Sequence, residues 1–291
     1  MQELTSPKEM REWSRAERAR GRRIGFVPTM GFLHEGHLRL VDRAKQRADR
    51  VAMSIFVNPL QFGPTEDLAQ YPRDLARDRT LAAERGVDCL FVPDTAAMYP
   101  TEPLVRVSPG PMADALEGAA RPGHFAGVLT VLAKLFHIVE PDVAVFGRKD
   151  FQQAMLVRRL AADLDFGLEV DVAPTVRELD GLALSSRNTY LQGDERRAAL
   201  ALSRALRAVE QAWRGGEADP GPLARRGLEV LRAPGVAPEY LALVDEQMRP
   251  VARVDARTAV LVAAKVGKTR LIDNVVLGEG VASDISVRAL A

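Results

Sequence analysis

Short runs of apolar residues alternate with amphipathic stretches through residues 1–175 of the chain. The runs are nearly continuous in apolar residues, which is typical of parallel strands that helices cover on both faces. They predict strands over Ile24–Val27, Val51–Val57, Cys89–Val92, Val143–Phe146 and Leu168–Val172. Between them, apolar residues recur every three or four positions, which predicts helices over Gly36–Ala48, Leu75–Arg85, Ala126–Val139 and Phe151–Leu164. The alternation predicts a doubly wound α/β domain with a parallel sheet, whose ligand site lies at the carboxyl ends of the strands.

The pattern changes after Asn188. Two predicted helices come first and three clustered strands follow, at Asp194–Trp213, Pro222–Leu231, Tyr240–Val244, Ala259–Ala263 and Leu271–Leu277. Helices followed by strands favour a smaller α+β domain. We place the boundary near Pro174, which divides the chain into domains of residues 1–175 and 176–291. The segment Met1–Arg20 is predicted to form a short helix on the first domain.

The 291 residues are 47% hydrophobic and 27% charged, which is ordinary for a soluble globular protein with a buried core. The net charge of +1 predicts no broad basic face and argues against nucleic acid as a main partner. No apolar stretch approaches the ~20 residues needed to cross a bilayer, and the charged segment Met1–Arg23 is no signal peptide. We therefore expect a cytoplasmic protein without a membrane partner. The single cysteine, Cys89, lies in an apolar run and is predicted to be a buried, inert thiol.

The segment Pro28–His37 follows the first predicted strand and opens the first long helix. Unpaired N–H groups and the positive end of the helix dipole make such a position suitable for phosphate. Two histidines three positions apart, His34 and His37, can both direct ring N–H donors at one anion. Gly31 and Gly36 permit a close approach of the backbone.

Two other interpretations of the histidine pair are open at this point. A helical zinc site would need His-Glu-x-x-His spacing, which the segment lacks. The histidines could instead serve only helix capping and packing. Their position at the end of the first strand favours phosphate, and His34-Glu35-Gly36-His37 resembles the His-x-Gly-His signature of the nucleotidylyltransferase superfamily. In that superfamily the histidines stabilise a triphosphate while its α-phosphorus is attacked.

The segment Ser54–Phe62 places Asn58 and Gln61 after the second predicted strand. Amides in this position can hydrogen-bond a substrate hydroxyl or carboxylate without carrying charge. Taken on its own, the segment is better explained as an ordinary Asn-Pro turn.

The segment Phe146–Gln153 passes from a strand through Gly147 into a helix. It holds Lys149, whose ammonium is a point-charge donor suited to phosphate. Asp150 suits either a helix cap or a ribose hydroxyl. Capping alone does not explain the Gly-Arg-Lys sequence before it.

The segment Val176–Asn188 lies at the predicted domain junction. Two hydroxyls and a guanidinium follow one another in it, at Ser185, Ser186 and Arg187, and form a compact clamp for an oxyanion. Such a tripeptide is commonplace in loops, but on a mobile junction it is suited to closing over a triphosphate.

Two other nucleotide-binding signatures are not matched. Gly267-Lys268-Thr269 resembles the end of a phosphate loop, yet Val262 stands where the first glycine belongs, and a predicted strand follows instead of a helix. No Gly-x-Gly-x-x-Gly follows the first strand, which argues against a dinucleotide-dependent dehydrogenase.

Together, the four segments resemble the pantothenate synthetase family in order and spacing. The resemblance runs from Ile24 to Asn188 and includes Tyr71-Pro72-Arg73 and Arg121–Val128, whereas beyond Asn188 it rests on domain order. It implies a Rossmann-like first domain, a smaller second domain that acts as a lid, a homodimer through the first domains, and Mg2+ with ATP as cosubstrate. The implied reaction has two steps. Pantoate attacks the α-phosphorus of ATP to give pantoyl adenylate and pyrophosphate, and β-alanine then displaces AMP.

The resemblance also implies roles for individual residues. His37, His34 and Lys149 would be catalytic, with His37 the main donor. Pantoate would be held by Gln61 and Gln153, with β-alanine also near Gln61. ATP would be bound by Met30, Gly31, His34, Gly36, His37, Gly147, Lys149, Asp150, Val176, Leu184, Ser185, Ser186 and Arg187. No residue is assigned to a metal, although Asp78 is one candidate among many surface aspartates.

Three positions depart from the common pattern of the family: Phe32 replaces a small residue, Arg148 replaces Glu, Gln or Lys, and Leu184 replaces Met. Arg148 is expected to add positive charge beside the site and to shift the affinity for ATP. Two alternative functions remain. Another His-x-Gly-His nucleotidylyltransferase acting on a different small substrate would not need the paired glutamines or the Ser-Ser-Arg segment. A non-enzymatic RNA-binding relative would carry a basic surface.

Overall fold

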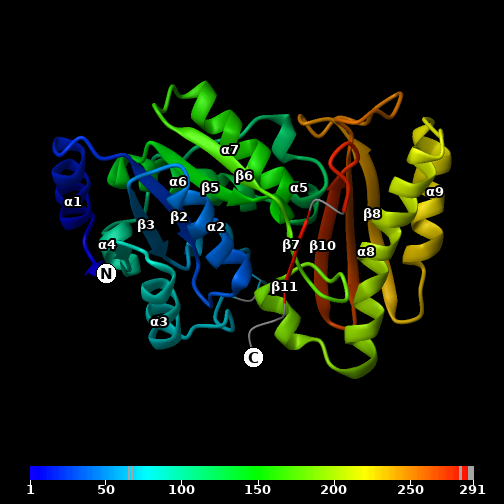
Figure 1. Cartoon of the computed structure of the whole chain (residues 1–291), viewed down its shortest axis with the longest axis horizontal. Helices are drawn as coiled ribbons and strands as arrows, with labels where there is room; N and C mark the ends of the chain where they lie inside the picture. The colour runs from blue at the N-terminus through cyan, green and yellow to red at the C-terminus, as the bar shows by residue number, and fades with distance from the viewer. Residues whose placement is uncertain (65, 67, 282–283, 288–291) are drawn as a thin grey trace. The chain divides into compact units, whose positions relative to one another are not determined.

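The computed structural model describes residues 1–64, 66, 68–281 and 284–287 of the chain. The chain is divided into two compact units (Figure 1). Unit 1 comprises Met1–Leu33, His37–Gly147 and Gln153–Ala173, and unit 2 comprises His34–Gly36, Arg148–Gln152 and Pro174–Ala291. Two short segments that interrupt the sequence of unit 1 therefore belong to unit 2, and both carry residues that the sequence analysis predicts to bind phosphate.

Unit 1 is built on a sheet of six parallel strands in the order β1-β4-β3-β2-β5-β6. The strands are β1 (Gln2–Leu4), β2 (Ile24–Thr29), β3 (Arg50–Ile55), β4 (Cys89–Phe91), β5 (Val143–Gly147) and β6 (Glu169–Ala173). The five predicted strands correspond to β2 to β6, with small shifts at their ends, and the doubly wound α/β fold is confirmed. β1 has only three residues, too few for a periodic pattern to reveal.

Helices cover both faces of this sheet (Figure 1). α2 (Glu35–Lys45) and α3 (Leu75–Arg85) bury apolar side chains against β2 and β3 on one face. α1 (Pro7–Ala19) packs with α6 (His124–Val139). Crossovers between parallel strands are almost always right-handed, which for this strand order places α6 and α7 (Phe151–Asp163) on the opposite face. The shorter elements of unit 1 are α4 (Thr95–Met98), α5 (Glu117–Ala120) and the 3-10 turns η1 (Pro59–Gln61) and η2 (Pro111–Ala113), while the 3-10 turn η3 (Arg148–Asp150) belongs to unit 2.

The strand order of unit 1 reverses at β2. β3 and β4 follow β2 on one side of it, whereas β5 and β6 lie on the other side. The carboxyl ends of β2 and β5 thus flank the switch point, where doubly wound sheets bind their ligands.

Unit 2 contains an antiparallel sheet in the order β10-β9-β8, together with a two-stranded parallel pair of β11 and β7. Its core lies between this sheet and two helices, with side chains such as Leu202, Leu206 and Leu223 packed on Val260 and Val262. The elements are β7 (Val176–Glu178), η4 (Ser186–Tyr190), α8 (Gly193–Arg214), α9 (Pro220–Leu231), β8 (Val236–Val244), β9 (Ala259–Val266), β10 (Thr269–Val276) and β11 (Ile285–Val287). The predicted α+β character is confirmed, while β7 and β11 were not predicted.

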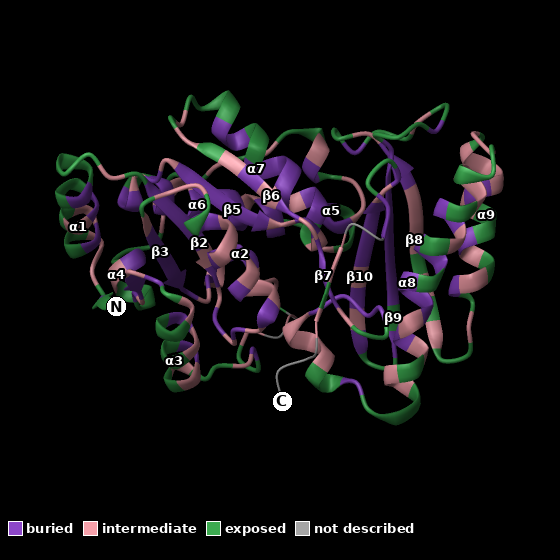
Figure 2. Ribbon diagram, viewed as in Figure 1, coloured by how far each residue is buried: buried purple, intermediate pink, exposed green. Residues whose placement is uncertain are grey.

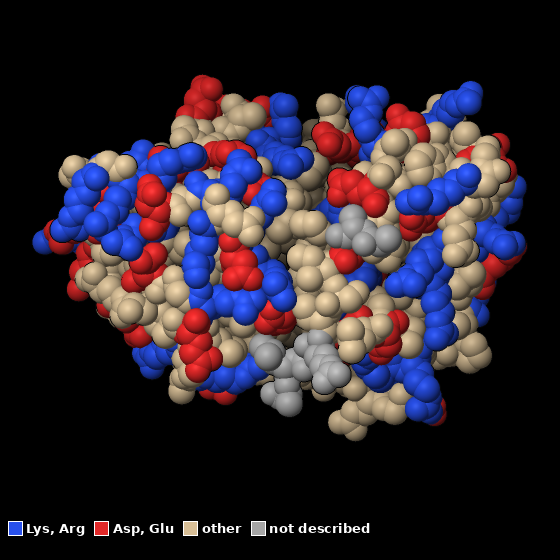
Figure 3. All heavy atoms as spheres, viewed as in Figure 1, with Lys and Arg blue, Asp and Glu red and all other residues tan. Residues whose placement is uncertain are grey.

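The central strands of both sheets are buried, and the exposed residues lie on the outer faces of the helices and in the loops (Figure 2). Cys89 is fully buried, so the prediction of a buried thiol is confirmed, and burial raises the pKa of the thiol to about 12. Positive and negative side chains are interspersed on the face that Figure 3 shows. Among the described residues, no helix combines the length and the apolar composition needed to cross a membrane.

Candidate active site

The switch point of unit 1 is flanked by two glycines. β5 ends at Gly147, where an added Cβ would meet none of the described atoms within 4 Å. β2 leads to Met30 and Gly31, and Gly31 has a φ of +85°. A Cβ on Gly31 would lie 3.0 Å from both Asp78 Oδ2 and Ile55 Cγ2, so the loop requires glycine there. Three residues predicted to bind ATP therefore lie at the ends of the two strands that flank the switch point.

Asp78 of α3 anchors the loop that follows β2. Its Oδ2 accepts the backbone N–H of Phe32 at 2.8 Å, and its Oδ1 accepts that of Leu33 at 2.7 Å. Burial raises the pKa of this carboxyl, and the two backbone N–H donors partly counteract the rise. The description of Asp78 as one surface aspartate among many is wrong, because the residue is only 1% exposed.

Phe32 has a φ of +51°, in the left-handed region that aromatic residues rarely adopt. Its backbone is held by Asp78, and its ring lies 5.8 Å from the guanidinium carbon of Arg77. Arg77 also donates to the carbonyl oxygen of Leu33 at 2.8 Å. The large side chain at this position is therefore stabilised by a cation–π contact that a small residue could not make.

Gln61 lies in η1, directly after β3, and is nearly buried. Its Nε2 donates to Sδ of Met30 at 3.2 Å, which joins two predicted binding residues from neighbouring strand ends. Asn58 orients the amide: its Nδ2 donates to Oε1 of Gln61 at 3.1 Å and to the carbonyl oxygen of Gly127 at 3.2 Å. The hydroxyl of Tyr99 donates to Oδ1 of Asn58 at 2.9 Å. Asn58 thus does more than form a turn.

A second group supports the main chain of Gln61. Nη1 of Arg121 lies 2.9 Å from Nε2 of His124, and a guanidinium can only donate. The ring hydrogen of His124 is therefore on Nδ1, which donates to the carbonyl oxygen of Gln61 at 2.9 Å. Arg121 also pairs with Glu66 at 2.7 Å, and this hydrogen bond lowers the pKa of the Glu66 carboxyl.

His37 and Gln153 also belong to unit 1 and lie in the first turns of α2 and α7. Both residues are half-buried. Gln152, which precedes Gln153, is 2% exposed. Of the two adjacent glutamines, the one predicted to hold pantoate is therefore the more accessible.

In unit 2, the segment His34–Gly36 lies beside the segment that contains Leu184. The backbone N–H of Gly36 donates to Nδ1 of His34 at 3.1 Å, so the hydrogen of the neutral ring is on Nε2. A Cβ added to Gly36 would lie 3.9 Å from Cβ of Leu184. Two predicted ATP-binding segments, distant in the sequence, are thus neighbours in this unit.

The Ser-Ser-Arg segment is held by backbone pairing with β7. The N–H of Leu184 donates to the carbonyl oxygen of Val176 at 2.9 Å. Ser185 then caps η4, because its Oγ accepts the N–H of Arg187 at 3.2 Å. Ser185, Ser186 and Arg187 are half-buried, so their polar groups remain partly accessible.

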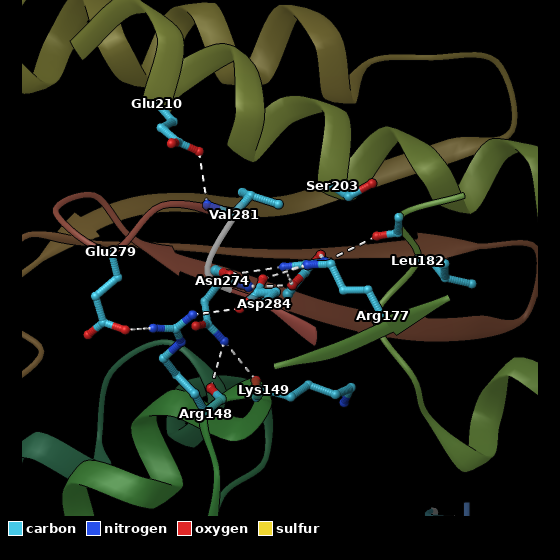
Figure 4. A network of polar contacts seen from close by, with 12 residues as sticks. Arg148, Lys149, Arg177, Leu182, Ser203, Glu210, Asn274, Glu279, Val281 and Asp284 are labelled. Carbon is cyan, nitrogen blue, oxygen red and sulfur yellow. Dashed lines mark hydrogen bonds and ion pairs between the residues drawn. The ribbon is translucent and has the colours of Figure 1, made fainter. Parts of the chain in front are cut away.

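Lys149 extends from η3, the turn that joins β5 to α7. Its Nζ lies 3.8 Å from Oδ1 of Asp150, and the two side chains are 21% and 51% exposed. Arg148 is buried instead, and pairs with Glu279 and, at 2.6 Å, with Asp284 (Figure 4). The expectation that Arg148 adds positive charge beside the site is wrong, because these two carboxylates offset its charge.

The sequence matches the family model described as Pantoate-beta-alanine ligase over residues 2–276. The chain belongs to the pantoate–β-alanine ligase family. The pantothenate synthetase of Pelotomaculum thermopropionicum is 50% identical over 273 residues, which are 93% of this chain and 97% of that protein. The pantothenate synthetase of Deinococcus radiodurans is 53% identical over 263 residues, which are 88% of this chain and 94% of that protein.

Solved structures of pantothenate synthetases share the fold of this ligase. A crystal structure from Thermus thermophilus aligns with a TM-score of 0.90 and 47% identity, covering 95% of this chain and 99% of that one. A crystal structure from Francisella tularensis, complexed with "Beta-gamma ATP and Beta-alanine", aligns with a TM-score of 0.80 and 34% identity. It covers 97% of this chain and 99% of that one.

The sequence did not reveal every residue that supports the site of this ligase. Asn58 stood out after a strand, but nothing indicated that it orients Gln61. Asn274 was missed, although its Nδ2 donates to the carbonyl oxygens of Arg148 at 2.9 Å and Lys149 at 2.8 Å. It lies in a predicted strand more than a hundred residues away, and nothing in the sequence around it predicts this contact.

Proposed function

We propose that this ligase condenses pantoate with β-alanine to form pantothenate, with ATP as cosubstrate. In the first step the pantoate carboxylate attacks the α-phosphorus of ATP, the bond to the bridging oxygen breaks, and pyrophosphate leaves. In the second step the β-alanine amine attacks the acyl carbon of pantoyl adenylate, AMP leaves with the bonding electron pair, and the amine loses a proton. The observation that carries the proposal is the presence of Met30, Gly31 and Gly147 at the switch point of a chain in this family.

Gln61 and Gln153 are the proposed holders of pantoate, with β-alanine also near Gln61. The amide of Gln61 supports this role because Asn58 fixes its orientation at the carboxyl end of β3. A neutral amide can hydrogen-bond the hydroxyls and carboxylate of pantoate. Because the amide carries no charge, it neutralises little of the negative charge on the pantoate carboxylate, and the carboxylate remains nucleophilic.

His34, His37 and Lys149 are the proposed donors to the phosphates. Negative charge accumulates on the phosphate oxygens as pyrophosphate leaves, and prepositioned donors stabilise it. Neutral His34 can donate only through Nε2, since Nδ1 accepts from Gly36. The further contacts to ATP are assigned to Met30, Gly31, Gly36, Gly147, Asp150, Val176, Leu184, Ser185, Ser186 and Arg187.

We infer that Mg2+ enters as its complex with ATP. Enzymes usually hold Mg2+ through one or two carboxylates together with substrate phosphates. In the described part of the chain, no group of three or more His, Cys, Asp or Glu side chains could hold a metal ion. Asp78 is buried and already accepts two backbone N–H groups. The triphosphate itself would therefore supply most of the ligands, and Mg2+ would offset its charge.

Residues 176–291 are proposed to act as a lid on the first domain, residues 1–175, and to keep water from the acyl adenylate. A homodimer and a cytoplasmic location are also part of the proposal, on the strength of the family resemblance. Leu104 and Val105 support the dimer, since these adjacent apolar residues are 97% and 86% exposed. Adjacent apolar side chains so fully exposed suggest an interaction surface.

The test is exchange of labelled pyrophosphate into ATP in the absence of β-alanine. We expect exchange only when pantoate is present. Pantoate and ATP then form pantoyl adenylate and pyrophosphate reversibly, and the reverse reaction carries the label into ATP without β-alanine. Adding β-alanine should release AMP. Release of ADP would instead indicate an acyl phosphate and would contradict the proposal.

A further inference from the structure

The amide of Asn274 holds the turn from which Lys149 extends. Asn274 lies on β10, and its Nδ2 donates to the carbonyl oxygens of Arg148 and Lys149 at 2.9 and 2.8 Å (Figure 4). Both hydrogens of one amide nitrogen thus bind two successive carbonyl groups. Asn274 is 1% exposed, so water does not compete for these bonds. All of these residues belong to unit 2.

A buried network of ion pairs fixes Asn274 in turn. Its backbone N–H donates to Oδ1 of Asp273 at 2.8 Å, and its carbonyl oxygen accepts from Arg177 at 3.3 Å. Arg177 binds Asp273 through two further bonds of 2.7 and 2.9 Å. Asp284 joins the network to the turn, with bonds of 2.6 Å to Arg177 and to Arg148. The backbone at Asn274 is therefore held from several sides.

An apolar side chain at position 274 could not hold the turn. Nδ2 of Asn274 supplies two N–H donors, one for each carbonyl oxygen, whereas an apolar side chain has none. Among the described residues, the side-chain hydrogen bonds of Asn274 go to the turn alone.

We propose that Asn274 is a positioning residue of the ligase, which acts through Lys149. It fixes the backbone of Arg148–Asp150, so that Nζ of Lys149 meets the phosphates where charge develops. The inference rests on the proposed function, in which Lys149 donates to the departing pyrophosphate. The side chain of Lys149 leads away from the buried network and is 21% exposed (Figure 4). The network therefore fixes the backbone from which the side chain extends, while Nζ remains accessible to a ligand. A displacement of about 1 Å at such a group can lower a rate on the order of 100-fold.

The test is a double-mutant cycle with Asn274→Ala, Lys149→Ala and the double variant, read by single-turnover formation of pantoyl adenylate. Asn274→Ala should slow the step at least about 10-fold at saturating substrates, with the affinity for pantoate unchanged. In the Lys149→Ala background, the same change should cost less than about twofold, since the group that it positions is gone. An equal factor in both backgrounds would mean a merely structural role and would overturn the inference.

Thr258→Ala is the matched control. Thr258 is also a buried polar residue of unit 2, and its Oγ1 accepts the backbone N–H of Asp255 at 3.0 Å. This variant should lower the melting temperature but not the rate of adenylate formation. If Asn274→Ala does not fold, Asn274→Ser replaces it in the cycle, because serine retains one donor, and the rate loss should be smaller but equally dependent on Lys149. A wild-type chain that forms no adenylate would contradict the proposed function, which is a different outcome from equal factors in the cycle.

Discussion

Gln61 donates through Nε2 to Sδ of Met30 at 3.2 Å, although the two residues follow different strands. β2 and β3 are neighbours in the sheet of unit 1, and their parallel pairing brings both carboxyl ends to one edge. A thioether is a weak acceptor, whereas a carboxylate is a strong one. The amide of Gln61 therefore loses little when it exchanges Met30 for a carboxylate substrate, and its position is already set by Asn58.

Substituting Asn58 should weaken the binding of pantoate. In Asn58→Ala, Gln61 loses the donor that orients its amide, so the KM for pantoate should rise about 10-fold, or ~1.4 kcal/mol. The KM for ATP serves as the internal control and should change little. The measurement is the initial rate of pyrophosphate exchange over a range of pantoate concentrations. An unchanged KM for pantoate in a folded variant would remove Gln61 from the pantoate site.

Substituting Lys149 should slow adenylate formation without unfolding the protein. Loss of a donor to the departing pyrophosphate should raise the barrier by about 3 kcal/mol, which is on the order of 100-fold in rate. The free energy of unfolding should change by less than ~0.5 kcal/mol, as is usual for a partly exposed residue. Single-turnover formation of the adenylate by Lys149→Ala measures the effect.

Lys268→Ala is the control for this prediction. Lys268 is exposed in the turn between β9 and β10, within the segment that only resembles a phosphate loop. Its substitution should leave both rate and stability unchanged. Near-wild-type turnover by Lys149→Ala would show that this lysine does not act on the phosphates.

Arg148 should contribute to stability, since its charge is buried. Arg148→Met leaves Glu279 and Asp284 without one guanidinium partner, and should lower the free energy of unfolding by about 3 kcal/mol. Arg257→Met removes an exposed pair with Asp255 and should cost less than ~0.5 kcal/mol. Urea unfolding of both variants tests the contrast. A similar loss of unfolding free energy at the two positions would mean that the burial of Arg148 does not increase its contribution to stability.

The pair of Glu66 and Arg121 should make stability depend on pH. The hydrogen bond from Arg121 lowers the pKa of Glu66 in the folded state. The charged carboxylate therefore stabilises the fold above the pKa of an unfolded glutamate, about 4.3, and this contribution disappears as the pH falls through the lower folded pKa. Glu66→Gln should cost about 1 kcal/mol at neutral pH and progressively less in acid. A cost that stayed constant with pH would exclude the charge as its cause.

The proposed dimer should be sensitive to the exposed apolar pair in unit 1. Sedimentation of the wild-type chain should give about twice 31.8 kDa. Charged residues at both positions, Leu104→Asp with Val105→Asp, should produce a monomer, because an interface does not bury unpaired carboxylates. Leu164→Asp, at another exposed leucine, is the control and should remain a dimer. A wild-type monomer would contradict the proposal directly.

The sequence predictions are accurate where the interactions are between residues close in the sequence, and they fail where the partners are distant in the sequence. The helix Leu75–Arg85 was predicted at its true ends because its signals are local: Asp74 caps its first turn, and Gly86 ends it in the left-handed conformation. β7 and β11 were not predicted. They are three-residue strands that pair across more than a hundred residues of sequence, and no periodicity can develop over so short a length.

The same reasoning explains the two misjudged charges. Arg148 reads as a free cation in the sequence, and only its distant partners Glu279 and Asp284 reveal that its charge is offset. Asp78 reads as a surface residue of an amphipathic helix, and only the loop that it anchors explains its burial. The segments that follow the strands, by contrast, were predicted because a parallel sheet brings the carboxyl ends of its strands to one edge. This location depends on the backbone topology and not on side-chain contacts.

The carboxylate of Asp78 takes the backbone N–H groups of Phe32 and Leu33, and thereby withholds them from any anion bound above the loop. A phosphate loop built of backbone amides cannot lose a donor to a point mutation, since every residue except proline carries the same N–H group. In the proposed site that work passes to the imidazoles of His34 and His37, which are side chains. Single substitutions could then remove the phosphate donors of this enzyme one at a time, so its hold on a triphosphate would depend on residue identity at these two positions.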